Sequence, residues 1–199
     1  YPKLAPQPIN EVELLNGYLE ETNKAYSIAK IAGITLCQSF NKQYNTNFIS
    51  VMPTNLYGLN DNYHPTDSHV IPGLIRRLHE AKLEKRAWVE IWGSGKPMRE
   101  FLFADDLADA CLFLMKTYNS SEIINVGSGE ELSILELAHH IKKAVGFQGE
   151  IKLNKNMLDG TPRKIIDSSR IHNLGWKHKT DFFEGLKITY QDFKNKLDA

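Results

Sequence analysis

Short apolar runs alternate along this chain with longer segments of helical periodicity. Runs typical of strands are NFISVM at 47–52, VEIW at 89–92, FLF at 101–103, IINV at 123–126 and residues 150–153. Helices are expected at 22–44, at 69–84, from Asp105 or Asp106 to Tyr118, at 134–145, near 168–173 and from Asp181 onward. Strands that alternate with helices predict an α/β fold with at least some parallel sheet.

Turn-forming residues separate these elements. Residues 1–21 are rich in proline, and 53–67 form a long polar segment after a strand, so both are expected to be irregular loops. Residues 93–100 are expected to form a turn. Two helix starts have the Ser/Asp-x-x-Glu pattern of a capping box, and these are Ser133 with Glu136 and Asp181 with Glu184.

Charge and cysteine content exclude several classes of function. The formal net charge is zero, so the 199 residues have no basic surplus for nucleic acid or an anionic membrane. No apolar run approaches the length of about 18 residues that favours a membrane span, and the start has no signal-peptide pattern. Cys37 and Cys111 lack the spacing of metal ligands, which predicts no metal site. We expect both thiols to be reduced and buried, in a cytoplasmic protein.

Tyr26 and Lys30 are the first candidate for chemistry. They stand four residues apart, which places them on one face of the expected helix. An ammonium near a phenol stabilises the phenolate and makes the phenol a better acid–base group. An exposed helical pair without any function is the alternative. Tyr190 and Lys194 repeat the spacing, but their polar neighbours indicate a solvent-facing surface.

One glycine-rich turn could be mistaken for a dinucleotide fingerprint. Gly127-Ser128-Gly129 follows a strand and precedes a helix, but Leu132 stands where the third glycine is required. Glu130 and Glu131 also give the turn a negative charge where a pyrophosphate needs a positive one. We therefore expect a structural turn, and any nicotinamide-binding fingerprint has to precede Tyr1.

Several longer stretches together resemble one family. They are YPKLAPQPINE, AYSIAKIAG, FISVMPTNLYG, SHVIPGLIRRLHEAK, WGSGKPMREFLFADDLADA, INVGSGEELSILELA and DGTPRKIID. The chain resembles the C-terminal three-fifths of the GDP-L-fucose synthase family, within the extended short-chain dehydrogenase/reductase superfamily. The resemblance implies the end of a Rossmann-type NADP-binding domain at 1–65. It implies a smaller α/β domain that binds the GDP-sugar at 66–199, with some segments that return to the first domain.

The resemblance also implies a reaction, the NADPH-dependent 3,5-epimerisation and 4-reduction of GDP-4-keto-6-deoxy-D-mannose. Tyr26 is then the acid that protonates the C4 oxygen, Lys30 supports it and binds the nicotinamide ribose, and His69 is the acid of the epimerisation. Implied contacts to the NADP cofactor are Tyr26, Lys30, Pro53, Thr54, Asn55, Leu56 and His69. The catalytic serine and cysteine of the family precede the matched segment, and neither Cys37 nor Cys111 replaces that cysteine.

Arg77, Trp92, Arg99 and Asp159 match family positions that contact the GDP-sugar, and arginine suits a diphosphate because it binds in a bidentate manner. Without the resemblance, Trp92 reads equally as a core aromatic residue and Asp159 as a turn residue. The family also implies a homodimer that pairs through helices including the one with Tyr26. Two alternatives remain open, a different nucleotide-sugar epimerase or dehydratase and a non-catalytic nucleotide-sugar binding fragment.

Overall fold

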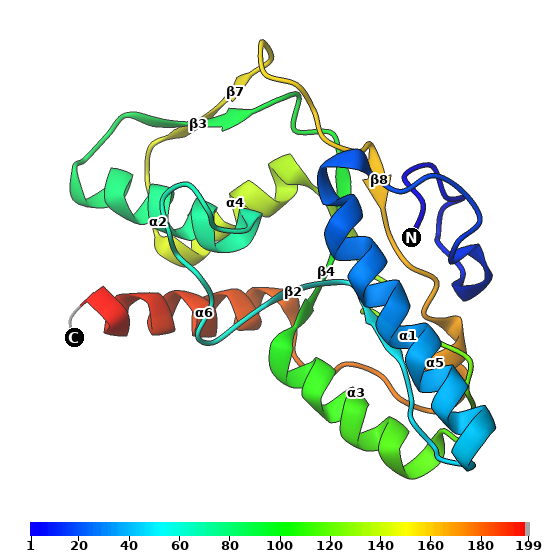
Figure 1. Ribbon diagram of the computed structural model, residues 1–199. Helices are drawn as coiled ribbons and strands as arrows, with labels where there is room; N and C mark the ends of the chain where they lie inside the picture. Colours follow the sequence, from blue (N-terminus) through cyan, green and yellow to red (C-terminus); the bar gives the residue numbers. More distant parts are fainter. Residues whose placement is uncertain (198–199) are drawn as a thin grey trace.

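The computed structural model describes residues 1–197 (Figure 1). Its helices are α1 (Lys24–Tyr44), α2 (Val70–Leu83), α3 (Ala104–Thr117), α4 (Ile134–Val145), α5 (Ser169–Asn173) and α6 (Phe182–Leu197), with short 3-10 turns η1 (Glu11–Glu13) and η2 (Glu21–Asn23). Its strands are β1 (Val51–Pro53), β2 (Asn55–Tyr57), β3 (Trp88–Trp92), β4 (Met98–Phe103), β5 (Ile124–Val126), β6 (Glu131–Ser133), β7 (Glu150–Asn154) and β8 (Arg163–Lys164).

The strands pair mostly in parallel. β1 pairs with β5, β2 with β4, β4 with β8, and β3 with β7, all in parallel, while β4 and β6 are antiparallel. β4 lies at the centre of the largest group, with β2 and β6 as its hydrogen-bonded neighbours. The α/β fold with parallel pairing that the sequence predicts is confirmed.

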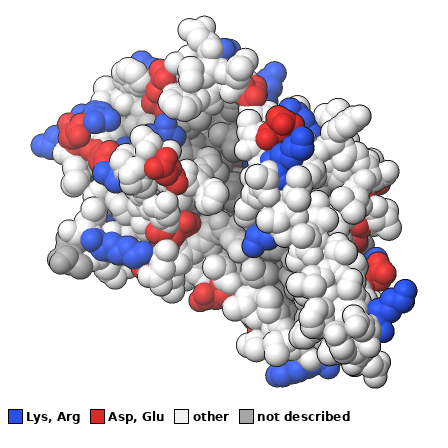
Figure 2. All heavy atoms as spheres, in the orientation of Figure 1, with Lys and Arg blue, Asp and Glu red and all other residues white. Residues whose placement is uncertain are grey.

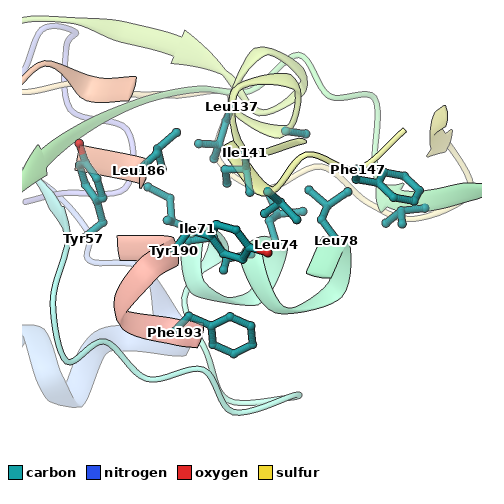
Figure 3. Packing of buried hydrophobic residues seen from close by; sticks show 14 of the residues in the cluster. Tyr57, Ile71, Leu74, Leu78, Leu137, Ile141, Phe147, Leu186, Tyr190 and Phe193 are labelled. Carbon is teal, nitrogen blue, oxygen red and sulfur yellow. The ribbon is translucent and has the colours of Figure 1, made fainter. Parts of the chain in front are cut away.

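The larger hydrophobic core lies between α2, α4 and α6 (Figure 3). Leu74 and Leu78 of α2, Ile141 of α4 and Leu186 of α6 are almost completely buried there. Because apolar residues recur every three or four positions on these helices, each helix turns one stripe toward the shared interior. This packing fixes α2, whose first turn follows His69, against the strands β3 and β4.

A second core lies around α3, β5 and α5. Leu114 of α3, Ile124 of β5 and Ile171 of α5 pack with Leu102 of β4 and with Trp176. Asp106 is also buried here, and its carboxylate accepts from the backbone N–H groups of residues 179 and 180 at 3.1 Å each. The prediction that Asp105 or Asp106 caps α3 was therefore wrong, because Asp106 instead fixes a distant loop.

Several strand predictions were wrong in position. β2 lies within the expected loop 53–67, β4 begins within the expected turn 93–100, and β6 and β8 were not predicted. β1 occupies Val51–Pro53 rather than 47–52. These strands are short, and they form because a neighbouring strand supplies hydrogen-bonding partners, which local sequence does not reveal.

Burial corrects two further expectations. Tyr190 is only 7% exposed, and its hydroxyl lies 2.9 Å from Nδ1 of His79 in the larger core, so the predicted solvent-facing surface was wrong. Cys37 and Cys111 are free but only half-buried.

The capping box of Ser133 and Glu136 is confirmed. Asp181 accepts from the N–H groups of Phe183 and Glu184, whereas the carboxylate of Glu184 contacts Lys187.

Candidate functional site

Tyr26 and Lys30 lie on the same exposed side of α1. The Tyr26 side chain is 60% exposed, and Nζ of Lys30 lies 5.5 Å from the centroid of its ring. The i, i+4 spacing of the helix explains this contact. The ammonium therefore lies over the ring face, and the phenol remains open to a reactant on the solvent side. A phenol held in this way can donate a proton to an oxygen and retain the negative charge beside a cation.

Residues 53–56 are held between strands rather than forming a free loop. The N–H of Thr54 donates to the carbonyl of Val126 at 3.0 Å. The hydroxyl of Thr54 and the amide of Asn55 both donate to the backbone carbonyl of Glu100, at 3.2 and 2.7 Å. Pro53 ends β1, and Leu56 in β2 is 37% exposed. The segment is thus a fixed platform beside the central strand.

His69 is exposed at the N-terminal end of α2. It occupies the cap position, but its side chain makes no capping hydrogen bond there. Its backbone carbonyl accepts from the N–H of Gly73 at 3.0 Å. Burial raises the pKa of the nearby Asp61, and the charge of His69 opposes this rise. The imidazole is therefore open to solvent at the start of α2.

Arg77 and Trp92 line one cleft of about 500 Å³, together with Glu90 and Trp88. Nη1 of Arg77 donates to the backbone carbonyl of Glu90 at 3.4 Å, and burial lowers the pKa of the Arg77 guanidinium. Trp92 is 63% exposed at the end of β3, so it is not a core residue. An aromatic face and a cation therefore border the same cleft.

Arg99 and Asp159 lie on neighbouring segments but are already engaged with the protein. Nη1 of Arg99 donates to the carbonyls of Met98 and Thr161, both at 2.7 Å. Asp159 accepts from the N–H and the hydroxyl of Ser94, at 2.8 and 2.6 Å. These hydrogen bonds hold the pKa of Asp159 below its usual range. Asp159 thus fixes the turn that follows Trp92.

Lys164 was not singled out from the sequence, although it stands in the quoted stretch DGTPRKIID. It is the direct neighbour of Arg99 across β4 and β8. Partial burial lowers the pKa of the Lys164 ammonium, and so does the charge of Arg99. The adjacent Arg163 pairs with Glu131 at 2.7 Å on the other side of the short strand. The alternation of side chains along a strand could have pointed to Lys164. It places Lys164 on the opposite face from Arg163, whose charge is neutralised by Glu131.

The turn at 127–129 bonds to the protein itself. Glu100 is fully buried, and its carboxylate accepts from the N–H of Gly129 at 2.9 Å and from that of Ile166 at 3.1 Å. Burial raises the pKa of Glu100, which these hydrogen bonds partly offset. A pyrophosphate would need backbone N–H groups of this turn, but the carboxylate of Glu100 already accepts a hydrogen bond from Gly129. A pyrophosphate therefore does not fit here. Tyr26 and Lys30, by contrast, present a hydroxyl and an ammonium on an exposed helix, and such groups suit the nicotinamide and ribose end of a dinucleotide.

Figure 2 shows a hollow between α1 and the lobe that carries α2 and α4. Acidic and basic side chains are interspersed on this face. Within residues 1–197, no helix is long and apolar enough to cross a membrane. The same residues contain no group of three or more His, Cys, Asp or Glu side chains suited to a metal ion.

Comparisons with known proteins give a family and close relatives. The model of the NAD dependent epimerase/dehydratase family matches residues 1–127. The chain is 56% identical over 191 residues to probable GDP-L-fucose synthase 1 of Oryza sativa subsp. japonica, and 51% identical over 207 residues to GDP-L-fucose synthase of Escherichia coli (strain K12). These matches cover 96% and 100% of the chain but only 58% and 64% of the relatives.

A solved structure of a GDP-L-fucose synthetase from Naegleria fowleri, bound to NADP, has a TM-score of 0.93 at 31% sequence identity. The match covers 100% of this chain and 64% of that one. The chain therefore spans about three-fifths of the length of its relatives. Their shared Rossmann-type architecture agrees with the fold described above.

Proposed function

The chain belongs to the NAD dependent epimerase/dehydratase family, and on that premise we propose that it acts in the NADPH-dependent conversion of GDP-4-keto-6-deoxy-D-mannose to GDP-L-fucose. The observation that carries the proposal is the exposed Tyr26 phenol with the Lys30 ammonium 5.5 Å from its ring. The names of the relatives with 51% and 56% identity supply the product, GDP-L-fucose. The dependence on NADP follows from the family and from the NADP-bound structural relative.

In the proposed reduction, the Tyr26 hydroxyl donates a proton to the C4 oxygen of the sugar. Lys30 then stabilises the phenolate that remains, because an opposite charge favours the ionised form. NADPH supplies the hydride when it is bound. Lys30, His69 and the platform of Pro53, Thr54, Asn55 and Leu56 are the residues that would hold its nicotinamide end.

In the proposed epimerisation, His69 is the acid that returns a proton to the sugar, and the resemblance assigns removal of the proton from the other face to the catalytic cysteine that precedes the matched segment. A 4-keto group acidifies the protons at C3 and C5, and removal of one gives an enolate. Return of a proton to the opposite face inverts the centre. Histidine suits this role because its ordinary pKa lies close to neutral pH. His69 is exposed and makes no capping hydrogen bond with its side chain.

The proposed substrate site combines the cleft with the neighbouring cations. Arg77 and Trp92 border the cleft, while Arg99 and Lys164 stand side by side on β4 and β8. Adjacent cations favour a diphosphate, whose charge offsets their mutual repulsion. Asp159 takes part through the turn that it fixes after Trp92, and its exposed carboxylate can also accept from a sugar hydroxyl.

We also propose the organisation of the protein. Residues 1–65 belong to the cofactor-binding domain and 66–199 mainly to the substrate-binding domain, with β5 returning to the first because it pairs with β1. The family resemblance supports a homodimer through α1, whose apolar side chains are exposed in the described residues. A cytoplasmic location is supported by the free thiols of Cys37 and Cys111.

A variant of the full-length protein tests the catalytic proposal. Tyr26→Phe removes the proton donor without changing the ring, so NADPH oxidation with the 4-keto sugar should fall about 100-fold or more. Tyr44→Phe is the matched control, because Tyr44 is similarly exposed at the other end of α1. Mass balance and NMR of the product check for GDP-L-fucose.

Three results contradict the proposal. Equal turnover of Tyr26→Phe and wild type removes the catalytic role of the phenol. A preference for UDP-sugars indicates a different nucleotide-sugar epimerase or dehydratase. Thermal stabilisation by GDP with no response to NADPH indicates a binding protein without redox activity.

A further inference from the structure

The outward face of β3 carries a carboxylate between two indole rings. Val89 and Ile91 point into the core, whereas Trp88, Glu90 and Trp92 alternate with them on the other face. All three outward residues line the cleft of about 500 Å³ beside Arg77. Adjacent outward positions of a strand are about 6.6 Å apart, so Glu90 lies within reach of a planar group stacked on either ring.

Neighbouring side chains orient Glu90. The amide Nδ2 of Asn154 donates to Oε1 of Glu90 at 2.9 Å, from the position on β7 that pairs with Trp92. Lys152, the cross-strand neighbour of Glu90, places its ammonium over the ring of Trp88 at 5.1 Å. One face of the Trp88 ring is thus covered by a cation. Trp92 is 63% exposed and Trp88 44%, so Trp92 offers the more open ring for stacking.

We propose that Glu90 determines base specificity by reading the guanine of the GDP-sugar, with Trp92 as the surface on which the base stacks. This inference rests on the proposed function. An ionised carboxylate only accepts hydrogen bonds, and its two oxygens suit two adjacent donors. Guanine presents such a pair, N1–H and the N2 amino group, on one edge.

Other bases do not match the carboxylate equally well. Adenine presents an acceptor at N1 beside its amino group, which a carboxylate repels. Uracil has one N–H between two carbonyl acceptors. Hypoxanthine retains N1–H but lacks the amino group, so inosine diphosphate differs from GDP by the loss of one donor. Arg77, which donates to the backbone of Glu90, remains at the cleft for the diphosphate.

Binding of GDP and inosine diphosphate to the full-length protein tests the inference by calorimetry. Wild type should bind GDP about 10-fold or more tightly than inosine diphosphate, because a hydrogen bond to a charged group is gained. Glu90→Gln should bring the two affinities close to parity, since an NH2 donor replaces one of the two acceptor oxygens and only one carbonyl oxygen remains, which Asn154 already engages in Glu90. Trp92→Ala should weaken both ligands and leave their ratio unchanged.

Glu150→Gln is the matched control, because Glu150 is an exposed carboxylate on β7 opposite Trp88, and it should keep the preference for GDP. Equal affinity of wild type for the two nucleotides, or an unchanged preference in Glu90→Gln, overturns the assignment of Glu90. No binding of GDP by wild type overturns the proposed function itself. The wild-type comparison needs no variant, so a folding defect in Glu90→Gln leaves the test intact.

Discussion

Glu100 connects three segments of the site. Its carboxylate accepts from the backbones of Gly129 and Ile166, and its own carbonyl accepts from Thr54 and Asn55. The residue is fully buried. Because a buried donor without a partner costs free energy, each of these N–H groups depends on the carboxylate. The platform at residues 54–55 and the turn at 127–129 therefore share one support.

Glu100→Ala should lower the free energy of unfolding by about 2–4 kcal/mol, because the buried N–H of Ile166 and the N–H of Gly129 lose their acceptor. Urea denaturation measures this loss. Glu130→Ala is the control, since this exposed glutamate lies in the same turn and its removal should change stability by less than about 0.5 kcal/mol. Equal losses in the two variants contradict the structural role of Glu100.

Two tyrosine–lysine pairs show how far local sequence determines a site. Nζ of Lys30 lies 5.5 Å from the ring of Tyr26, and Nζ of Lys194 lies 5.2 Å from that of Tyr190. Helical spacing predicted both contacts. It did not predict burial, since Tyr26 is 60% exposed and Tyr190 only 7%. Which phenol can meet a substrate depends on how the helices pack, so no local pattern separates the pairs.

The start of α4 has the most complete set of capping hydrogen bonds predicted from the sequence. The Ser133 hydroxyl accepts from the N–H of Glu136 at 3.1 Å, and the Glu136 carboxylate accepts from the N–H of Ser133 at 2.7 Å. Hydrogen bonds from the backbone and hydroxyl of Ser133 hold the pKa of Glu136 below its usual range. The carboxylate therefore stabilises the helix in its ionised form.

Ser133→Ala should lower the free energy of unfolding by about 1 kcal/mol, the usual cost of losing a cap. The pH dependence tests Glu136. Its pKa is lower in the folded state, so its contribution is fully present above the unfolded value of 4.5 and is lost as the pH falls through the folded value. Glu136→Gln should destabilise the protein at pH 7 but match wild type in strong acid.

Urea denaturation at several pH values measures both effects. Glu184→Gln is the control on α6, where the glutamate contacts Lys187 instead of the backbone before it. A loss in Glu136→Gln that is constant with pH contradicts the role of the ionised carboxylate in the cap.

Helices were easier to predict than strands because their determinants are local. The apolar periodicity of α2 and α4 and the residues at their ends lie within the helical segments themselves, so the sequence predicted both helices. β2, β6 and β8 have only two or three residues each and depend on β4 for their pairing. The position of Arg99 beside Lys164 is a product of that pairing, so the sequence did not predict it.

The molecule has two main cores that meet at β4. One contains α2, α4 and α6, and the other contains α3, α5 and β5. Phe101 and Phe103 of β4 belong to the first core and Leu102 to the second, because successive residues of a strand point to opposite faces. Arg77 lies on α2 and Trp92 on β3, in the first lobe, whereas Tyr26 lies on α1, the helix drawn in front of the second core in Figure 1.

α1 is the helix that these cores leave uncovered. None of its residues is buried, and Ile28, Leu36 and Phe40 are 51%, 58% and 41% exposed. Apolar side chains at this helical spacing form a stripe that favours burial against another surface. Helix pairing across a two-fold axis buries such a stripe on both copies at once.

Leu36→Glu in the full-length protein should therefore weaken the proposed homodimer and raise its dissociation constant about 10-fold or more, because the proposed interface would then have to bury a charge. Light scattering coupled to size-exclusion chromatography over a dilution series measures the shift. Leu83→Glu is the matched control, since Leu83 is 68% exposed at the end of α2. A monomeric wild type, or equal shifts in both variants, contradicts pairing through α1. Since Tyr26 lies on the same helix, a parallel loss of turnover in Leu36→Glu would show that pairing also supports the site.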